Sequence, residues 1–236
     1  MQIEKYYNDS DGKVTFSRLQ ASDFAKQIAD DFNPLHNVKT KRFCVPGDLL
    51  FSTVLAKYGC SQQMRFTFSG MVTDDVSLNL PAFSPELSIK GDNDKEYLSV
   101  EQSGDNSKDP ELRDSLIRSY VAFSGQTFPH ILVPLMEEKG VMINMARPMV
   151  MYQSMLIDLD RLDLTNIELE LDKEKTTFEN NGKRGNVCLA FNLIADQKVI
   201  GRGEKHMVAS GLKPFEESAI KAVIADYAQW KKDYIA

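Results

Sequence analysis

A helix that is apolar on almost every side is predicted at residues 46–59. Pro46 near its start and Gly59 after its end are typical helix boundaries. Between them, apolar residues point in nearly all directions instead of forming one stripe: Leu49, Leu50, Val54, Leu55 and Tyr58. Such a helix is stable only when other elements bury it. We therefore expect this segment to be the enclosed centre of a folded unit.

Alternation of apolar and polar residues predicts strands after this helix, at residues 64–72, 76–80, 87–89 and 96–102. The same order of elements then recurs, with helices from Pro110 and at 131–139 and strands at 149–159, 167–171, 176–194 and 199–210. A last helix begins near Lys213, with glutamates at its start and lysines near its end. The repeated order predicts an α+β fold with two similar units, residues 1–104 and 105–212, followed by a C-terminal helix at 213–236.

Another helix is predicted before the buried one. Phe24, Ile28 and Phe32 recur every fourth residue, which is the apolar stripe of a helix, and Ser22 is its expected N-cap. Pro34 disfavours helical backbone in the residue before it, so we expect this helix to end at about residue 32 or 33.

Asp31 and His36 lie on either side of this helix end. On a continuous helix they would be turned about 140° apart, at about 100° per residue. The Asn-Pro break removes that constraint, so the carboxylate and the imidazole can converge. A carboxylate beside an imidazole is a candidate acid–base pair for chemistry on water.

The residues Asp-x-Asn-Pro-Leu-His at 31–36, followed by Gly47 at the start of an apolar helix, resemble the signature of MaoC-like (R)-specific enoyl-CoA hydratases. The resemblance implies a hot-dog fold, in which a curved antiparallel sheet wraps a helix, and the repeated order then implies a double hot-dog. It implies that Asp31 and His36 activate the water that adds to a trans-2-enoyl thioester, while the Gly47 N–H polarises the thioester carbonyl. The implied substrate is an acyl-CoA or acyl-carrier-protein thioester, with no cofactor and no metal.

Two polar residues near this motif are further candidates for substrate binding. Asn33 is expected mainly to bond nearby backbone at the helix break. Ser52, just over one turn into the apolar helix, either contacts the substrate or bonds back to a helix carbonyl. Between the motif and the helix, the loop cations Lys39, Lys41 and Arg42 either meet the phosphates of a CoA-type ligand or are simply solvated.

The sequence departs from the family pattern in three places. Asp30 or Ala29 replaces the glycine that usually precedes the aspartate, Pro46 replaces a histidine before the helix-opening glycine, and the loop after His36 is short. The second unit carries His130 near its helix start but no matching Asp-x-Asn-Pro motif, so one active site per chain is expected. His206, on a late strand, is expected to be structural.

Composition excludes several classes of function. The net charge of −6 argues against nucleic acid as the main partner. No apolar run reaches the roughly 20 residues of a membrane span, and the first residues lack the apolar core of a signal peptide. Three widely spaced cysteines predict neither a disulfide framework nor a zinc site, and they favour a reducing cytoplasm. Because hot-dog units normally pair, a homodimer is compatible with this sequence.

Three alternatives to hydration stay open at this stage. A 3-hydroxyacyl-carrier-protein dehydratase shares the Pro46-Gly47 pair, but it uses a helix glutamate where this chain has Ser52. A thioesterase could use Asp48 as base or nucleophile. A non-catalytic protein could bind acyl thioesters in the same pocket without turnover.

Overall fold

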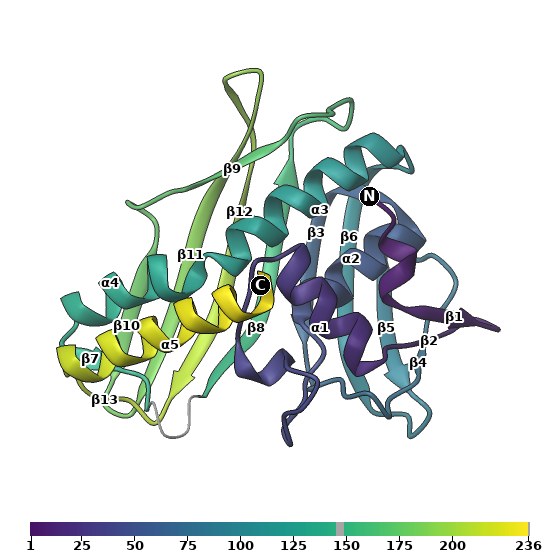
Figure 1. Cartoon of the computed structure of the whole chain (residues 1–236). Coiled ribbons are helices and arrows are strands. Elements are labelled where there is room, and N and C mark those ends of the chain that lie inside the picture. Colours follow the sequence, from purple (N-terminus) through teal and green to yellow (C-terminus); the bar gives the residue numbers. More distant parts are fainter. Residues whose placement is uncertain (145–148, 236) are drawn as a thin grey trace.

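The computed structural model describes residues 1–144 and 149–235. Its main feature is an eleven-stranded sheet in which every described pairing is antiparallel. The strand order is β1-β2-β4-β5-β6-β3-β8-β12-β11-β10, and β9 also pairs with β11 (Figure 1). The strands of this sheet are β1 Asn8–Ser10, β2 Lys13–Thr15, β3 Cys60–Phe68, β4 Leu78–Asn79, β5 Glu86–Gly91, β6 Glu96–Ser107, β8 Val150–Leu159, β9 Glu168–Leu171, β10 Thr177–Asn181, β11 Arg184–Ala195 and β12 Lys198–Ser210.

The pairing of β3 with β8 joins the two parts of the sheet. Its register runs from Gln63 opposite Asp158 to Thr67 opposite Ser154. Strands from residues 8–107 therefore lie on one side of this seam, and strands from residues 150–210 lie on the other.

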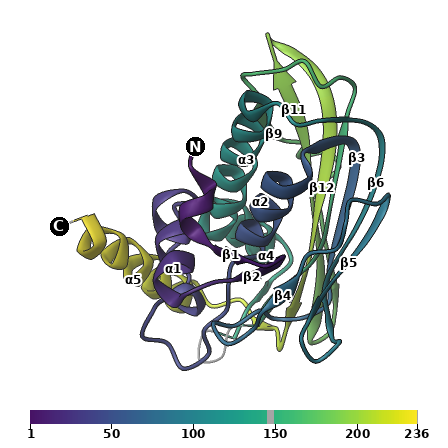
Figure 2. The same ribbon diagram turned by 90° about the vertical axis from the view of Figure 1, so that its right-hand side faces the viewer.

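Five α-helices in the described part of the chain form a second layer, on one side of the sheet (Figure 2). They are α1 Arg18–Gln27, α2 Gly47–Tyr58, α3 Pro110–Gly125, α4 Leu132–Glu138 and α5 Glu217–Ile235. The short helical turns are η1 Ile3–Tyr6, η2 Pro34–His36 and η3 Thr127–Ile131, and a small separate sheet pairs β7 Val141–Met142 with β13 Lys213–Pro214. The prediction of a buried helix at 46–59 is confirmed, because nine of the twelve residues of α2 are buried.

Aromatic side chains join the two long inner helices into one core. Phe51 of α2 packs edge-on against Phe66 of β3, with ring centroids 5.2 Å apart, and against Tyr120 of α3, at 4.9 Å. Tyr120 in turn lies 5.9 Å from Phe191 of β11. Because these four rings come from both sides of the seam, both parts of the sheet close over a shared interior.

The predicted end of the first helix is wrong. α1 ends at Gln27, and Ser17, not Ser22, is its N-cap, in a capping box with Gln20. Asp30 adopts a left-handed φ of 53°, which stops the helix well before Pro34, and aspartate is one of the few residues that tolerates this region. Asp31 therefore lies in a loop, where its N–H donates to the Ala25 carbonyl at 2.8 Å.

Gly125 at the end of α3 allows this loop to approach the helix closely. A Cβ atom at residue 125 would lie 1.6 Å from the carbonyl oxygen of Ala29, so only glycine permits the contact. The approach fixes the backbone just before Asp31 against α3.

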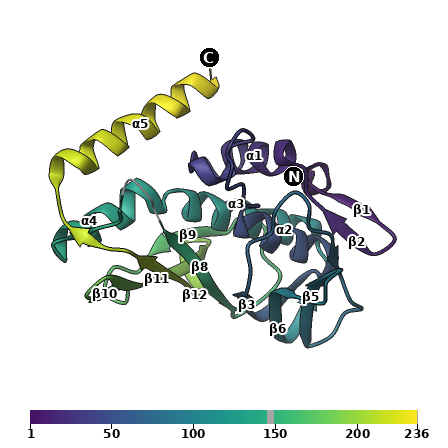
Figure 3. The same ribbon diagram turned by 90° about the horizontal axis from the view of Figure 1, so that it is seen from below.

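The C-terminal helix begins later than predicted, at Glu217, because Lys213 and Pro214 pair as a strand with β7. Seen from below, α5 lies farther from the sheet than α3 and α4 do (Figure 3). Within residues 1–144 and 149–235, no helix has the length and apolar character needed to cross a membrane.

Candidate functional site

The structure brings the two predicted catalytic side chains together. His36 Nε2 lies 3.7 Å from Asp31 Oδ2, and the side chains are only 13% and 26% exposed, respectively. The other ring nitrogen, His36 Nδ1, lies 2.7 Å from the carbonyl oxygen of Cys44. A carbonyl can only accept, so Nδ1 carries the hydrogen. Neutral His36 therefore presents the lone pair of Nε2 toward Asp31.

Two acceptors that face each other need a donor between them. In neutral His36 both Nε2 and Asp31 Oδ2 are acceptors, and a water molecule can donate one O–H to each. In protonated His36 the Nε2–H can instead donate toward Asp31 directly. The arrangement is thus suited to hold a water and to exchange a proton with it.

The loop that carries Asp31 is held by its own side chain and by α5. Asp31 Oδ1 accepts from the Asn33 N–H at 2.8 Å, which leaves Oδ2 facing His36. Tyr227 of α5 accepts from the Phe32 N–H at 2.9 Å and donates to the Asp30 carbonyl at 3.2 Å. Burial, with the nearby Asp31 charge, raises the pKa of the Tyr227 hydroxyl. Tyr227 therefore bridges the backbone on both sides of Asp31.

Replacing Tyr227 by phenylalanine is expected to lower the free energy of unfolding by about 1 kcal/mol, because the Phe32 N–H loses a partly buried acceptor. The ring stays, so its edge-on contact with Phe32 at 6.0 Å is kept. Urea denaturation measures the difference. Tyr234→Phe is the matched control. It removes a hydroxyl from the same helix as Tyr227, but this hydroxyl is exposed and accepts from the Gln27 side chain, so the change should cost less. Equal losses in the two variants would contradict this role of Tyr227.

Gly47 is the first residue of α2, so its N–H has no intrahelical acceptor and lies at the positive end of the helix dipole. The ring of Tyr152 packs against this glycine: a Cβ atom at residue 47 would lie 2.8 Å from Tyr152 Cδ1 and 3.4 Å from Phe68 Cε1. The absence of a side chain allows β3 and β8 to close over the start of α2.

The other predicted site residues have local roles in the structure. The Asn33 side chain caps η2 by accepting from the Leu35 N–H at 3.1 Å. The Ser52 side chain is fully buried and donates to the Asp48 carbonyl at 2.7 Å, so it bonds back to the helix. Lys39, Lys41 and Arg42 are exposed on the loop between His36 and α2.

A buried group of charged and polar side chains lies beside the Asp31–His36 pair. Asp48 of α2 is 8% exposed and Lys205 of β12 is 6% exposed. The Lys205 ammonium donates to the Ser124 hydroxyl of α3 at 2.5 Å, and Ser124 also hydrogen-bonds Asp48. Among the described residues, no group donates a hydrogen bond to Asp48 Oδ1.

Electrostatics tie this group to the Asp31–His36 pair. Burial raises the pKa of the Asp48 carboxyl; Asp31 adds to this, while Lys205, Ser124 and His36 oppose it. Burial lowers the pKa of the Lys205 ammonium, and the charges of Asp48 and Asp31 oppose that shift. Lys205 is therefore the cation that compensates two neighbouring carboxylates in an interior where isolated charges are costly.

Two tyrosines complete this interior. The hydroxyls of Tyr120 and Tyr152 are hydrogen-bonded to each other, and the Lys205 ammonium lies 4.7 Å from the centre of the Tyr152 ring. Burial and the nearby Asp48 charge raise the pKa of Tyr152 well above its ordinary value, so its hydroxyl stays protonated. The site is built from elements on both sides of the sheet seam.

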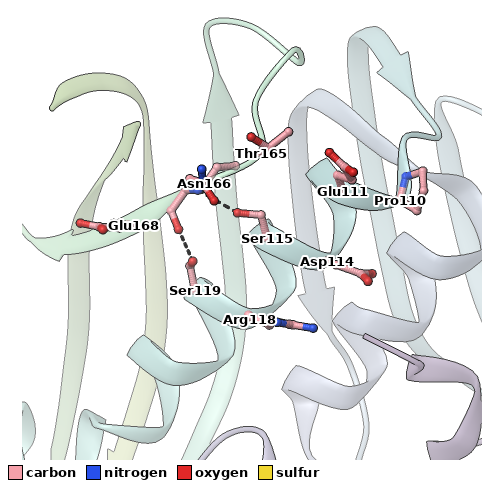
Figure 4. Close-up of a pocket in the computed structure, with 10 residues that line it drawn as sticks. Pro110, Glu111, Asp114, Ser115, Arg118, Ser119, Thr165, Asn166 and Glu168 are labelled. Carbon is pink, nitrogen blue, oxygen red and sulfur yellow. Dashed lines mark hydrogen bonds between the residues drawn. The ribbon is translucent and has the colours of Figure 1, made fainter. Parts of the chain in front are cut away.

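A surface pocket of about 430 Å³ lies elsewhere, between the start of α3 and the segment before β9 (Figure 4). Ser115 accepts from the Ile167 N–H at 2.7 Å, and Ser119 donates to the Ile167 carbonyl. The described residues that line this pocket do not include Asp31, His36 or Gly47.

Comparison with known proteins gives distant structural likenesses. A candidate thioesterase II from Thermobifida fusca YX has 6% identity and a TM-score of 0.47, with 85% of this chain and 93% of that chain covered. An acyl-CoA thioesterase II from Mycobacterium marinum has 8% identity and a TM-score of 0.45, with 92% and 100% covered. A MaoC-like dehydratase has 8% identity and a TM-score of 0.43, with 86% and 97% covered. At these scores, the likenesses assign no activity.

No curated protein matches the sequence. A family model described as "Protein of unknown function (DUF3581)" matches residues 1–218, which is most of the chain. The chain therefore belongs to the DUF3581 family.

Proposed function

We propose that this protein is a double hot-dog hydro-lyase that adds water to trans-2-enoyl thioesters, with Asp31 and His36 as its catalytic residues. The two hot-dog units would be residues 1–104 and 105–212, followed by a C-terminal segment that contains α5 (Glu217–Ile235). The observation that carries the proposal is the Asp31–His36 pair: two acceptors 3.7 Å apart, one of them fixed in tautomer by the Cys44 carbonyl.

In this mechanism a water held between Asp31 and His36 attacks C3 of the enoyl thioester. His36 Nε2 takes the proton of the attacking water as general base, and a proton returns to C2 on the same face. The N–H of Gly47, at the start of α2, donates to the thioester oxygen as negative charge develops there. Such donors contribute about 2.7–4 kcal/mol of transition-state stabilisation in comparable sites.

The exposed cations Lys39, Lys41 and Arg42, on the loop between His36 and α2, support a phosphate-bearing substrate arm such as that of CoA. If they bind it, an enoyl-CoA should be used more efficiently than the same acyl group on pantetheine, through a lower KM. An equal KM for the two would point to a carrier-protein substrate or to an unbound arm.

Thioester hydrolysis is the second candidate function. It is favoured by Asp48, whose Oδ1 is buried at the start of α2 with no donor among the described residues. Burial, which raises its pKa, disfavours the charged form that a base or nucleophile needs. We therefore place hydration first.

The test is to incubate the full chain with 2-enoyl-CoA substrates of increasing acyl length, starting with crotonyl-CoA. Loss of the conjugated enoyl absorbance without release of free thiol is the expected result. Free thiol with any acyl-CoA would support the thioesterase instead. Tight binding of the thioester with neither change would make this chain a non-catalytic acyl-thioester-binding protein.

A further inference from the structure

A second group of reactive side chains lies on the face of the sheet that points away from the helices. Cys188 of β11 and His206 of β12 are direct cross-strand partners, and Glu204 lies two residues before His206 on the same face. Leu189, Lys205 and Met207, which alternate with them, are buried on the helix side. Figure 2 shows the helices on the opposite side of β11 and β12. The group is thus separated by the sheet from the Asp31–His36 pair.

The ligand atoms of these three side chains are already gathered. One ligand atom from each of Cys188, Glu204 and His206 lies within 4.8 Å of the other two. His206 Nε2 is 2.8 Å from Glu204 Oε2 and 4.0 Å from Cys188 Sγ. In a tetrahedral zinc site, with bonds of about 2.0–2.3 Å, ligand atoms are about 3.3–3.7 Å apart. Small side-chain rotations on a fixed backbone would reach that spacing.

An ion pair between His206 and Glu204 explains why those two side chains are close together, but it does not explain why the Cys188 thiol lies beside them. A metal ion would displace the thiol proton and bind all three groups as nitrogen, sulfur and oxygen ligands.

The backbone around the group is regular on one side and bulged on the other. Thr177 of β10 lies opposite Cys188 in an unbroken register. Ser154 of β8 lies opposite His206, and the register shifts directly after this pair, so Gln153 is the extra residue. Bulges of this kind often redirect side chains next to functional sites.

We propose that Cys188, Glu204 and His206 form a zinc site with three protein ligands and a fourth position open to solvent. One nitrogen, one sulfur and one carboxylate ligand suit Zn²⁺, and three protein ligands with an open position are typical of sites where the metal binds a water or an outside ligand. The site does not depend on the proposed hydratase activity.

Titration of the metal-free full chain with Co²⁺, a spectroscopic substitute for Zn²⁺, tests this proposal. One equivalent per chain should give a thiolate-to-cobalt charge-transfer band, and Zn²⁺ should abolish that band by competition. Cys188→Ser should remove the band, and His206→Ala and Glu204→Gln should each weaken Co²⁺ binding at least tenfold. Far-UV circular dichroism of each variant shows whether it is folded.

Cys44→Ser and His130→Ala are the matched controls, because they remove a thiol and an imidazole outside the group. Both should keep the band and the affinity of the unaltered chain. No band with the unaltered protein, or a band lost in Cys44→Ser and kept in Cys188→Ser, would overturn the proposal.

Discussion

In the Asp31→Asn variant, hydration of crotonyl-CoA is expected to fall by about 10²–10⁴-fold, the usual contribution of a positioned acid–base group. Asparagine keeps the oxygen that accepts from the Asn33 N–H at 2.8 Å, so the loop should retain its shape. What is lost is the charged oxygen that faces His36. Initial rates at saturating substrate, together with urea denaturation of both proteins, measure the effect on catalysis and on stability separately.

Asp30→Asn is the matched control for this variant. Asp30 is the neighbouring carboxylate, pairs with Lys231 on the surface, and has a left-handed backbone that asparagine tolerates. Its activity should stay close to that of the unaltered chain. Near-normal turnover in Asp31→Asn, or an equal loss in Asp30→Asn, would rule out Asp31 as the catalytic carboxylate.

In the Lys205→Met variant, the free energy of unfolding is expected to drop by about 3–5 kcal/mol, because the change leaves Asp48 buried without its cation. Methionine keeps most of the aliphatic length of lysine, so the loss reports charge more than volume. Ser124 also loses its donor at 2.5 Å. Urea or thermal denaturation monitored by circular dichroism gives the value.

A double variant separates this electrostatic effect from a packing defect. Adding Asp48→Asn to Lys205→Met removes the uncompensated carboxylate, so it should recover about 0.5–3 kcal/mol, the range found for coupled neighbours. Lys198→Met, at an exposed position of the same strand, should change stability by no more than about 0.5 kcal/mol. A loss below about 1 kcal/mol in Lys205→Met, or simple additivity in the double variant, would contradict the coupling of Asp48 and Lys205.

Much of the fold follows from local patterns in the sequence. The buried helix at 46–59 is α2, the helix from Pro110 is α3, and the hairpin at 176–194 corresponds to β10 and β11. These segments have strong periodicity or clear turn signals, and their packing agrees with those signals. The prediction for the end of α1 is wrong because it relies on Pro34, which disfavours helix in the residue before it. The left-handed backbone of Asp30 ends the helix earlier.

A local motif predicts part of the site, and the rest depends on contacts between distant segments. Asp31, His36 and Gly47 lie within 17 residues of one another, so a short motif can indicate them. Lys205 and Ser124 come from distant segments and meet Asp48 only in the fold. The sequence does carry one signal for Lys205. It alternates in phase with Gly203 and Met207, so its side chain points to the face of the strand that is buried.

Strand pairing also explains why cysteine spacing gives no indication of the proposed metal site. Cys188 and His206 are 18 residues apart and become neighbours only because β11 and β12 pair in one register. Sequence motifs for zinc depend on close spacing along the chain, which cross-strand ligands do not show.

Hydration of crotonyl-CoA in oxygen-labelled water, with the unaltered chain and His36→Ala side by side, tests the central claim most directly. The proposed mechanism predicts that the label enters the C3 hydroxyl of an intact 3-hydroxyacyl thioester with the unaltered chain, and does not with His36→Ala. Label in the carboxylate of a free acid, or equal labelling of C3 by both proteins, would contradict the assignment of Asp31 and His36 as the pair that activates water.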